Sequence, residues 1–293
     1  MSELRGFAWV LNLDAELELA NVSHQASSRL NEQLQRFGAD SQRLLGPRDV
    51  LLPTGPLTLE TPGAWLGRAW CPTPRALARL AAAGVTAEAH PTLEVLQRVN
   101  HRRFAFELGG GLPTQAYCGS LAELEAHLDY VAGPWLLKRP FGFAGRGQLR
   151  VYRELDAVQR NWVDASLRLD GLIIEPLIEP QLEVSAHGFI DTQARVEFGL
   201  PCVQTVSDRG VFRGIRRAAA GELSEGELTL LRQTQERVAA ALIQAGYFGP
   251  FGVDAYRYRS ERLSGFCALS EINARYSMGF VTGFPRHPST LRV

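Results

Sequence analysis

Three oxygen-bearing side chains near the end of the chain have the types and spacing of a divalent-cation site. Asp254 lies in one strand-like apolar run, and Glu271 and Asn273 lie two residues apart in the next. Two strands joined by a turn form a hairpin, and residues two apart on a strand project from one face. Carboxylate and amide oxygens suit a hard cation such as Mg²⁺, and Arg275 would add positive charge beside a metal-bound anion. An exposed acidic face is the alternative interpretation.

A second candidate site joins an apolar run to a glycine-rich loop through one lysine. Residues 135–137 are apolar, Lys138 follows them, and residues 148–152 alternate like a returning strand. The glycines of the loop are Gly142, Gly145 and Gly147. Glycine tolerates positive φ and has no Cβ, so its backbone N–H groups can close over an anion. An ordinary hairpin loop is the alternative. The lysine precedes the glycines and no helix follows, so the phosphate-loop and Rossmann formulas do not fit.

An arginine-rich segment lies between these two sites. It is strand-like over residues 203–217 and contains Arg209, Arg213, Arg216 and Arg217. A guanidinium can bind a carboxylate or a phosphate through two parallel hydrogen bonds. We therefore expect Arg213 or Arg216 to bind an anionic substrate or a leaving phosphate, with solvated surface arginine as the alternative.

The composition indicates a globular protein without a strong charge field. Of the 293 residues, 45% are hydrophobic and 21% are charged, with 31 basic and 31 acidic side chains. This balance argues against nucleic acid or an anionic membrane as a partner. No apolar run approaches the roughly 20 residues of a membrane span, and the start lacks a secretory signal, so we expect a cytoplasmic protein. The four cysteines form no C-x-x-C pair and are expected to be reduced and mostly buried, with a zinc site or a catalytic cysteine as the alternatives.

Hydrophobic periodicity predicts the elements that would position these sites. In the first ninety residues it predicts strands over 7–11 and 49–53, helices over 27–37 and 73–84, and a loop over 54–72. One helix is expected over 92–108. Capping-box spacings begin helices at Ser120 and Ser224. A helix over 154–169 should bury Val158 and Trp162, and the helix after Ser224 should bury Leu228, Leu231, Val238 and Leu242. Strands are predicted over 172–178, 182–190 and 194–200.

Together these motifs resemble the ATP-grasp family over about residues 93–283. Lys138 is similar to the lysine that contacts the α- and β-phosphates, and the loop after it is similar to the family's glycine-rich flap. The segment Glu175, Pro176, Leu177 and Ile178 resembles the hinge that pairs with adenine, and Glu183 resembles the acid that holds the ribose. The string S-E-I-N-A-R at 270–275 is the most specific match. The family's other phosphate-binding cation is expected at Arg102, with Arg98 as the rival. Arginine stands there in place of the commoner lysine.

The resemblance implies a mixed α+β and α/β fold, with a small N-terminal α/β domain followed by a two-lobed ATP-grasp fold. The expected domains are residues 1–91, a small lobe with the flap at 92–180, and a large lobe with the metal hairpin at 181–293. It further implies that Asp254, Glu271 and Asn273 bind the metal.

The implied activity is that of an ATP-dependent ligase. MgATP, or MnATP in its place, would convert a carboxylate into an acyl phosphate, which an amine or a thiol then attacks. Arg275, Arg213 and Arg216 would act at the reacting anions. Two alternatives stay open: an ATP-binding regulatory or partner module without turnover, and a kinase or carboxylase on the same fold. The sequence names neither substrate and leaves a homodimer open.

Overall fold

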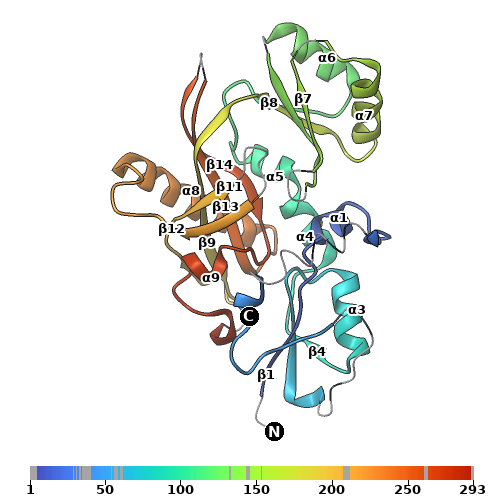
Figure 1. Ribbon diagram of the computed structural model, residues 1–293, viewed down its shortest axis with the longest axis vertical. Coiled ribbons are helices and arrows are strands. Elements are labelled where there is room, and N and C mark those ends of the chain that lie inside the picture. The colour runs from blue at the N-terminus through green and yellow to red at the C-terminus, as the bar shows by residue number, and fades with distance from the viewer. Residues whose placement is uncertain are drawn as a thin grey trace.

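The described part of the chain forms three β-sheets, which Figure 1 shows as three regions joined by helices α4 and α5. This computed structural model describes all residues except 1–4, 29, 31, 33, 35–40, 54, 56–58, 60–61, 132, 143–145, 153, 207–211, 261–262 and 292–293. The mixed fold class expected from the sequence is confirmed. No helix among the described residues has both the length and the apolar character needed to cross a bilayer.

The first sheet is parallel, in the order β2-β1-β3-β4. Its strands are β1 (Gly6–Val10), β2 (Val50–Leu51), β3 (Trp65–Ala69) and β4 (Thr86–Ala87). Helices α1 (Ala15–Ala20) and α3 (Pro74–Ala82) and the short turns η1 (Gln42–Leu44) and η2 (Pro62–Ala64) accompany it. The two strands and the proline-led helix predicted here are confirmed. The helix predicted over 27–37 falls largely outside the described residues.

The loop predicted over 54–72 is wrong, because β3 lies at its centre and pairs with β1. Gly67 and Arg68 interrupt the apolar pattern of this strand. Arg68 is nevertheless buried, since its guanidinium bonds both carboxylate oxygens of Glu88 and two backbone carbonyls near the C-terminus. A pattern of hydrophobic residues cannot reveal a strand whose buried charge is satisfied by distant partners.

The second sheet is antiparallel, in the order β5-β8-β6-β7. It consists of β5 (Ala116–Cys118), β6 (Trp135–Lys138), β7 (Gln148–Val151) and β8 (Leu172–Pro176), with helices α6 (Leu121–Tyr130) and α7 (Ala157–Leu167) packed on it. The capping box at Ser120 is confirmed. Trp162 is half-buried as predicted, but Val158 is 78% exposed because it lies in the first turn after the cap Asp156.

The third sheet has the order β12-β11-β9-β13-β14, and β10 also pairs with β9. Its strands are β9 (Glu179–Ile190), β10 (Val196–Phe198), β11 (Cys202–Val206), β12 (Phe212–Arg217), β13 (Gly249–Arg259) and β14 (Ser264–Asn273). Helix α8 (Glu225–Gln244) starts with the predicted capping box and buries Leu231, Val238 and Leu242. Leu228, predicted to be buried, is 42% exposed. The chain ends with α9 (Phe280–Gly283) and η3 (Pro288–Thr290).

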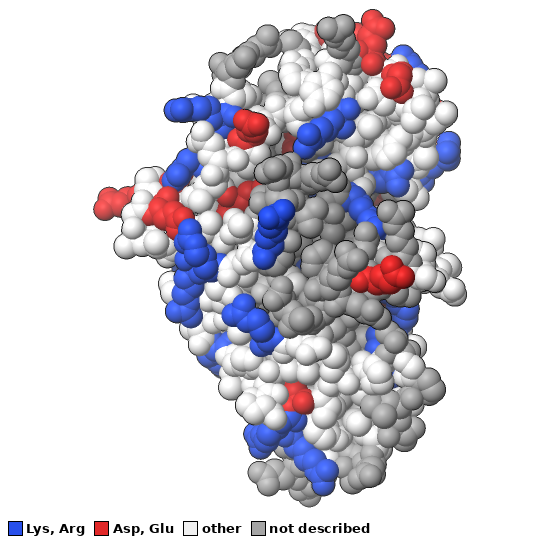
Figure 2. All heavy atoms as spheres, in the orientation of Figure 1, with Lys and Arg blue, Asp and Glu red and all other residues white. Residues whose placement is uncertain are grey.

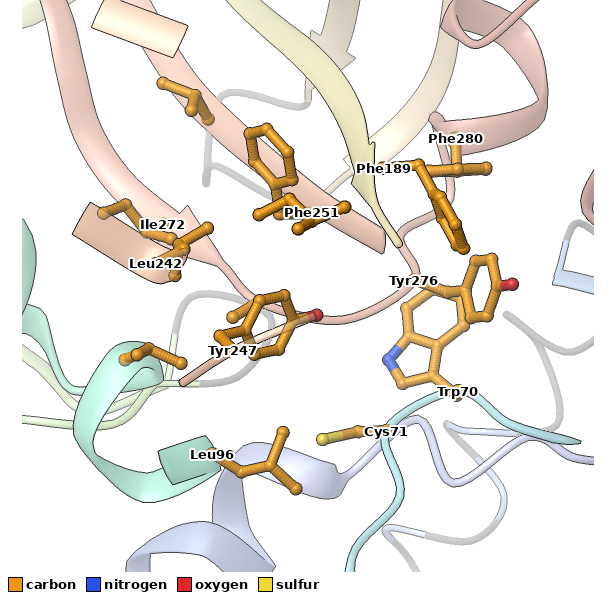
Figure 3. Close-up of a cluster of buried hydrophobic side chains, with 14 of the residues drawn as sticks. Trp70, Cys71, Leu96, Phe189, Leu242, Tyr247, Phe251, Ile272, Tyr276 and Phe280 are labelled. Carbon is orange, nitrogen blue, oxygen red and sulfur yellow. The ribbon is translucent and has the colours of Figure 1, made fainter. Parts of the chain in front are cut away.

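The single helix predicted over 92–108 is instead two helices, α4 (Leu93–Asn100) and α5 (Arg102–Glu107). His101 between them is extended, with ψ at 131°, and its side chain caps α5 by accepting from the N–H of Arg103. The largest core cluster brings Trp70 and Cys71, which follow β3, against Leu96 of α4 and against the third sheet (Figure 3). Helix α4 therefore packs where the first and third sheets meet.

The four cysteines are buried and unpaired, as predicted. On the described part of the face in Figure 2, basic side chains are interspersed with acidic ones.

Candidate active site

The β13–β14 hairpin places three oxygen-bearing side chains on one face. Asp254 lies directly opposite Glu271 in the strand register. The amide of Asn273 donates to Asp254 Oδ2 at 2.8 Å, and Gln204 of β11 donates to Asp254 Oδ1 at 3.2 Å. The two carboxylates and the amide predicted from the sequence are thus brought together.

The electrostatics of this hairpin suit a divalent cation. Burial, and then the negative charge of Glu271, raise the pKa of Asp254 to about 7. Two carboxylates that repel each other in this way would be stabilised by a cation between them. Among the described residues no group of three or more His, Cys, Asp or Glu side chains could hold a metal. Two acids and an amide could hold Mg²⁺, because that ion usually keeps several waters and takes few protein ligands.

Arg102 connects the hairpin to the flap. One guanidinium nitrogen donates to both oxygens of Glu271, at 3.1 and 3.2 Å, and the other donates to the carbonyl of Arg139 at 2.6 Å. A Cβ on Gly142 would lie 2.5 Å from this guanidinium, so only glycine allows the flap to approach so closely. The rival cation, Arg98, lies over the ring of Phe104 instead and does not line the same cavity.

Lys138 ends β6 and forms a buried ion pair with Glu175 on the neighbouring strand β8, at 2.5 Å. Burial raises the pKa of Glu183, and the charge of Lys138 opposes that effect, so these two groups lie within electrostatic reach of each other. The hairpin that carries Lys138 closes with Gly147 at φ +78°, a conformation that favours glycine. Gly145 lies outside the described residues.

The hinge-like segment after β8 is partly engaged within the protein. The N–H of Leu177 donates to the carbonyl of Pro134 at 2.8 Å, so it is not offered to a ligand. Pro176 ends β8, and Ile178 packs against Tyr256 and Tyr258. Two of the predicted adenine-binding residues thus already have partners within the protein: the amide of Leu177 bonds Pro134, and the side chain of Glu175 pairs with Lys138.

Arg275 is buried and forms an ion pair with Glu16 of helix α1. It also donates to Asn273 Oδ1 at 2.9 Å and to the carbonyl of Tyr276 at 2.8 Å. Burial raises the pKa of Glu16, and the nearby Arg275 opposes this rise. A residue of helix α1 therefore sets the position of the arginine beside the β13–β14 hairpin.

Neither of the two arginines predicted to bind an anion lines the cavity beside Asp254. Gln204 and Ile215 are opposite each other in the β11–β12 register and both line the cavity beside Asp254. Arg213 lies where the β11–β12 register shifts, with Phe212 opposite Val206 and Gly214 opposite Thr205, and it does not line this cavity. Arg216 projects from the other face and bonds both oxygens of Glu222, at 2.7 and 2.5 Å. The structure therefore does not bring Arg216 to the cavity.

One cavity collects six of the predicted residues, whereas Lys138, Glu175 and Glu183 do not line it. From the predicted set it is lined by Arg102, Gly142, Asp254, Glu271, Asn273 and Arg275. The sequence reasoning missed Glu16, Ser185, His187, Gln204 and Ser277, which line it too. Ser185 and His187 follow Glu183 at steps of two along β9, so period-2 alternation from the predicted Glu183 could have found them. No local sequence pattern indicates that Glu16 lies in this cavity.

Comparisons of sequence identify no relative, because neither a protein-family model nor a curated protein matches this chain. Comparison of the structure with solved structures shows that the chain has the ATP-grasp fold. The D-alanyl-alanine synthetase A of Vibrio cholerae matches with a TM-score of 0.59 and 14% identity, over 100% of this chain and 95% of that one.

Two further structures support the same fold. The N5-carboxyaminoimidazole synthetase of Staphylococcus aureus, complexed with ADP, matches with a TM-score of 0.55 and 10% identity, over 94% of this chain and 72% of that one. The pyruvate carboxylase of Rhizobium etli matches with a TM-score of 0.58 and 17% identity, over 93% of this chain but 26% of that one. The fold expected from the sequence motifs is confirmed.

Proposed function

We propose that this protein is an ATP-dependent ligase that activates a carboxylate as an acyl phosphate and joins it to an amine or a thiol. The observation that carries the proposal is the single cavity lined by flap residues Gly142 and Gln148 and by hairpin residues Asp254 and Glu271. Arg102 bonds both parts. The fold adds support, because two of the similar proteins are synthetases and one of these is complexed with ADP.

The residues divide into a nucleotide end and a reacting end. At the nucleotide end, Ile178 and Glu183 would contact adenine and ribose, and Lys138 and the glycine flap would contact the phosphates. At the reacting end, Asp254, Glu271 and Asn273 would hold Mg²⁺ or Mn²⁺, whose role is to neutralise the phosphate oxygens. Arg102 and Arg275 would supply further positive charge.

Positioning and electrostatics are what phosphoryl transfer requires. The transition state spreads negative charge over the equatorial oxygens of the transferred group, so catalysis depends on cations already held in place. At an effective dielectric constant near 20, two unit charges about 4 Å apart interact by roughly 4 kcal/mol. Arg275 is buried and held by Glu16 and Asn273, so it needs little reorganisation to act on a developing charge.

The test is a screen of the purified protein with MgATP against pooled carboxylic acids combined with amines and thiols. A ligase releases ADP and phosphate together with a new amide or thioester. Release of ADP without free phosphate would assign a kinase instead, and dependence on bicarbonate would assign a carboxylase. Nucleotide binding without turnover for every acceptor would favour an ATP-binding regulatory module. A cytoplasmic location belongs to this proposal, since that compartment supplies ATP.

A further inference from the structure

In the described part of the chain, a buried histidine and a buried serine in the cavity wall each have a side-chain atom without a hydrogen-bond partner. Ser185 and His187 are 2% and 1% exposed and lie two residues apart on β9, on the face that carries Glu183. Ser185 Oγ and His187 Nδ1 have no partner among the described residues. Leaving a buried polar atom unpaired costs free energy, so Ser185 Oγ in the cavity wall indicates a ligand that pairs with it.

Three glycines confine the His187 ring. A Cβ on Gly279 would lie 2.7 Å from ring atom Cε1 and 3.0 Å from Nε2, and one on Gly283 would lie 2.9 Å from Nδ1. Gly252, which is opposite His187 in the β9–β13 register, leaves room at the ring's other edge. Phe280 meets the ring edge-on at 6.1 Å between centroids. The ring therefore has a fixed orientation, with Nε2 beside Gly279, which lines the cavity, and Nδ1 beside Gly283.

This placement determines which nitrogen carries the proton. An imidazolium, or the tautomer protonated on Nδ1, would bury an N–H without an acceptor, and orphaned buried N–H groups are rare. Burial accordingly lowers the pKa of His187 to about 4. The remaining form is neutral, has a bare lone pair on Nδ1, and presents Nε2–H to the cavity. A histidine in this form donates a hydrogen bond and does not act as a base at Nε2.

Resting on the proposed ligase function, we propose that His187 Nε2–H and Ser185 Oγ–H form a binding subsite for an anionic oxygen of the acceptor carboxylate. Ser185 lies opposite Asp254 in the β9–β13 register, so this subsite adjoins the metal hairpin. The oxygen that stays on the carbonyl carbon gains negative charge when the amine or thiol attacks the acyl phosphate. Neutral donors stabilise that charge without the repulsion a further carboxylate would cause.

The first test reads the proton directly in the full-length protein. ¹⁵N-edited NMR should show His187 neutral, with its proton on Nε2, at neutral pH. Acetate titrated into protein saturated with MgADP should shift the Nε2 resonance of His187. A response to inorganic phosphate in place of acetate would overturn the carboxylate assignment, and a response to neither, or a proton on Nδ1, would overturn the subsite.

The second test uses substitutions that separate the donor from the ring. In His187→Gln the amide N–H can replace Nε2–H, whereas His187→Phe keeps a ring without a donor. We expect His187→Phe to weaken acetate binding roughly tenfold, as for the loss of one hydrogen bond, with MgADP affinity unchanged and His187→Gln close to wild type. His127→Phe, at a histidine that packs on Trp135 away from the cavity, is the control.

The two proposals fail in different ways. If the wild-type protein turns over no acceptor, the ligase function is contradicted, while the NMR response still decides the subsite. If an active ligase is unaffected by His187→Phe and by Ser185→Ala, the subsite is contradicted and the ligase stands.

Discussion

Arg102 and Glu271, which are 169 residues apart in the sequence, are joined by two hydrogen bonds from one guanidinium nitrogen to the two carboxylate oxygens. The same arginine holds the carbonyl of Arg139 at the base of the flap. The cation expected to bind phosphate therefore neutralises the acid expected to bind the metal. Nucleotide and metal would have to redistribute this pairing when they bind.

Arg102→Ala should change two affinities in opposite directions. Without nucleotide, the metal should bind more tightly, because Glu271 loses a competing cation. Affinity for MgATP should fall by roughly 10- to 100-fold, since a hydrogen bond to a charged group is worth about 1.5–3 kcal/mol. Calorimetry with Mn²⁺ alone and with MgATP measures both. Arg98→Ala is the matched control, and an equal loss of MgATP affinity in that variant would assign the phosphate cation to Arg98.

Lys138→Met should lower both nucleotide affinity and stability. The Lys138–Glu175 pair is buried, with side chains 12% and 7% exposed, and removing one member leaves an unpaired charge, at a cost of about 3–5 kcal/mol. The double variant Lys138→Met with Glu175→Gln should recover most of the stability in denaturant unfolding but none of the ATP affinity. Recovery of both would show that Lys138 is a structural partner of Glu175 and does not contact phosphate.

Glu271→Gln should leave the fold intact and reduce metal-dependent turnover by at least about 100-fold, the typical effect of removing one preorganised electrostatic partner of a transition state. ADP release across a range of Mg²⁺ concentrations measures this. Glu236→Gln is the control, because Glu236 belongs to an exposed ion pair with Arg232 on α8. Unchanged metal dependence in Glu271→Gln would remove the hairpin from the metal site.

Arg213→Ala and Arg216→Ala should differ. If Arg213 binds the anionic substrate, as the sequence predicts, its loss should lower turnover by roughly tenfold or more while ATP still binds, as expected for a lost charged contact to an anion. Arg216 pairs with Glu222, and its loss should leave turnover near the wild-type value. Steady-state kinetics of the two variants compares them directly, and the reverse order would contradict this prediction.

His187 should make the stability of the protein depend on pH between about 4 and 6.5. Its pKa falls from 6.5 to about 4 on burial, so in this interval the unfolded chain binds a proton that the folded chain does not. Stability then rises with pH across the interval, by on the order of 3 kcal/mol in total. Denaturant unfolding at several pH values should show a shallower slope for His187→Phe, and an unchanged slope would show that His187 does not titrate this way.

The parts predictable from sequence are those that adjacent residues encode. Glu271 and Asn273 share a face because they are two apart on a strand, and Ser120 begins a helix because Glu123 completes its cap. Strand β3 could not be predicted, because the hydrogen-bond partners of buried Arg68 lie far along the chain. The break at His101 could not be predicted, because the apolar residues of α4 and α5 follow the same helical periodicity. The place of Glu16 in the site could not be predicted, because only folding brings it next to Arg275.

The pairing of Glu16 with Arg275 has a consequence for rearranging this protein. Arg275 lies in the last strand region, but its counter-charge comes from the first twenty residues. A chimaera that exchanges the N-terminal unit for that of another protein must carry an acid to this one position, or leave a guanidinium uncompensated in the interior. At this contact, two recombined parts of the chain are compatible only if this one carboxylate is kept.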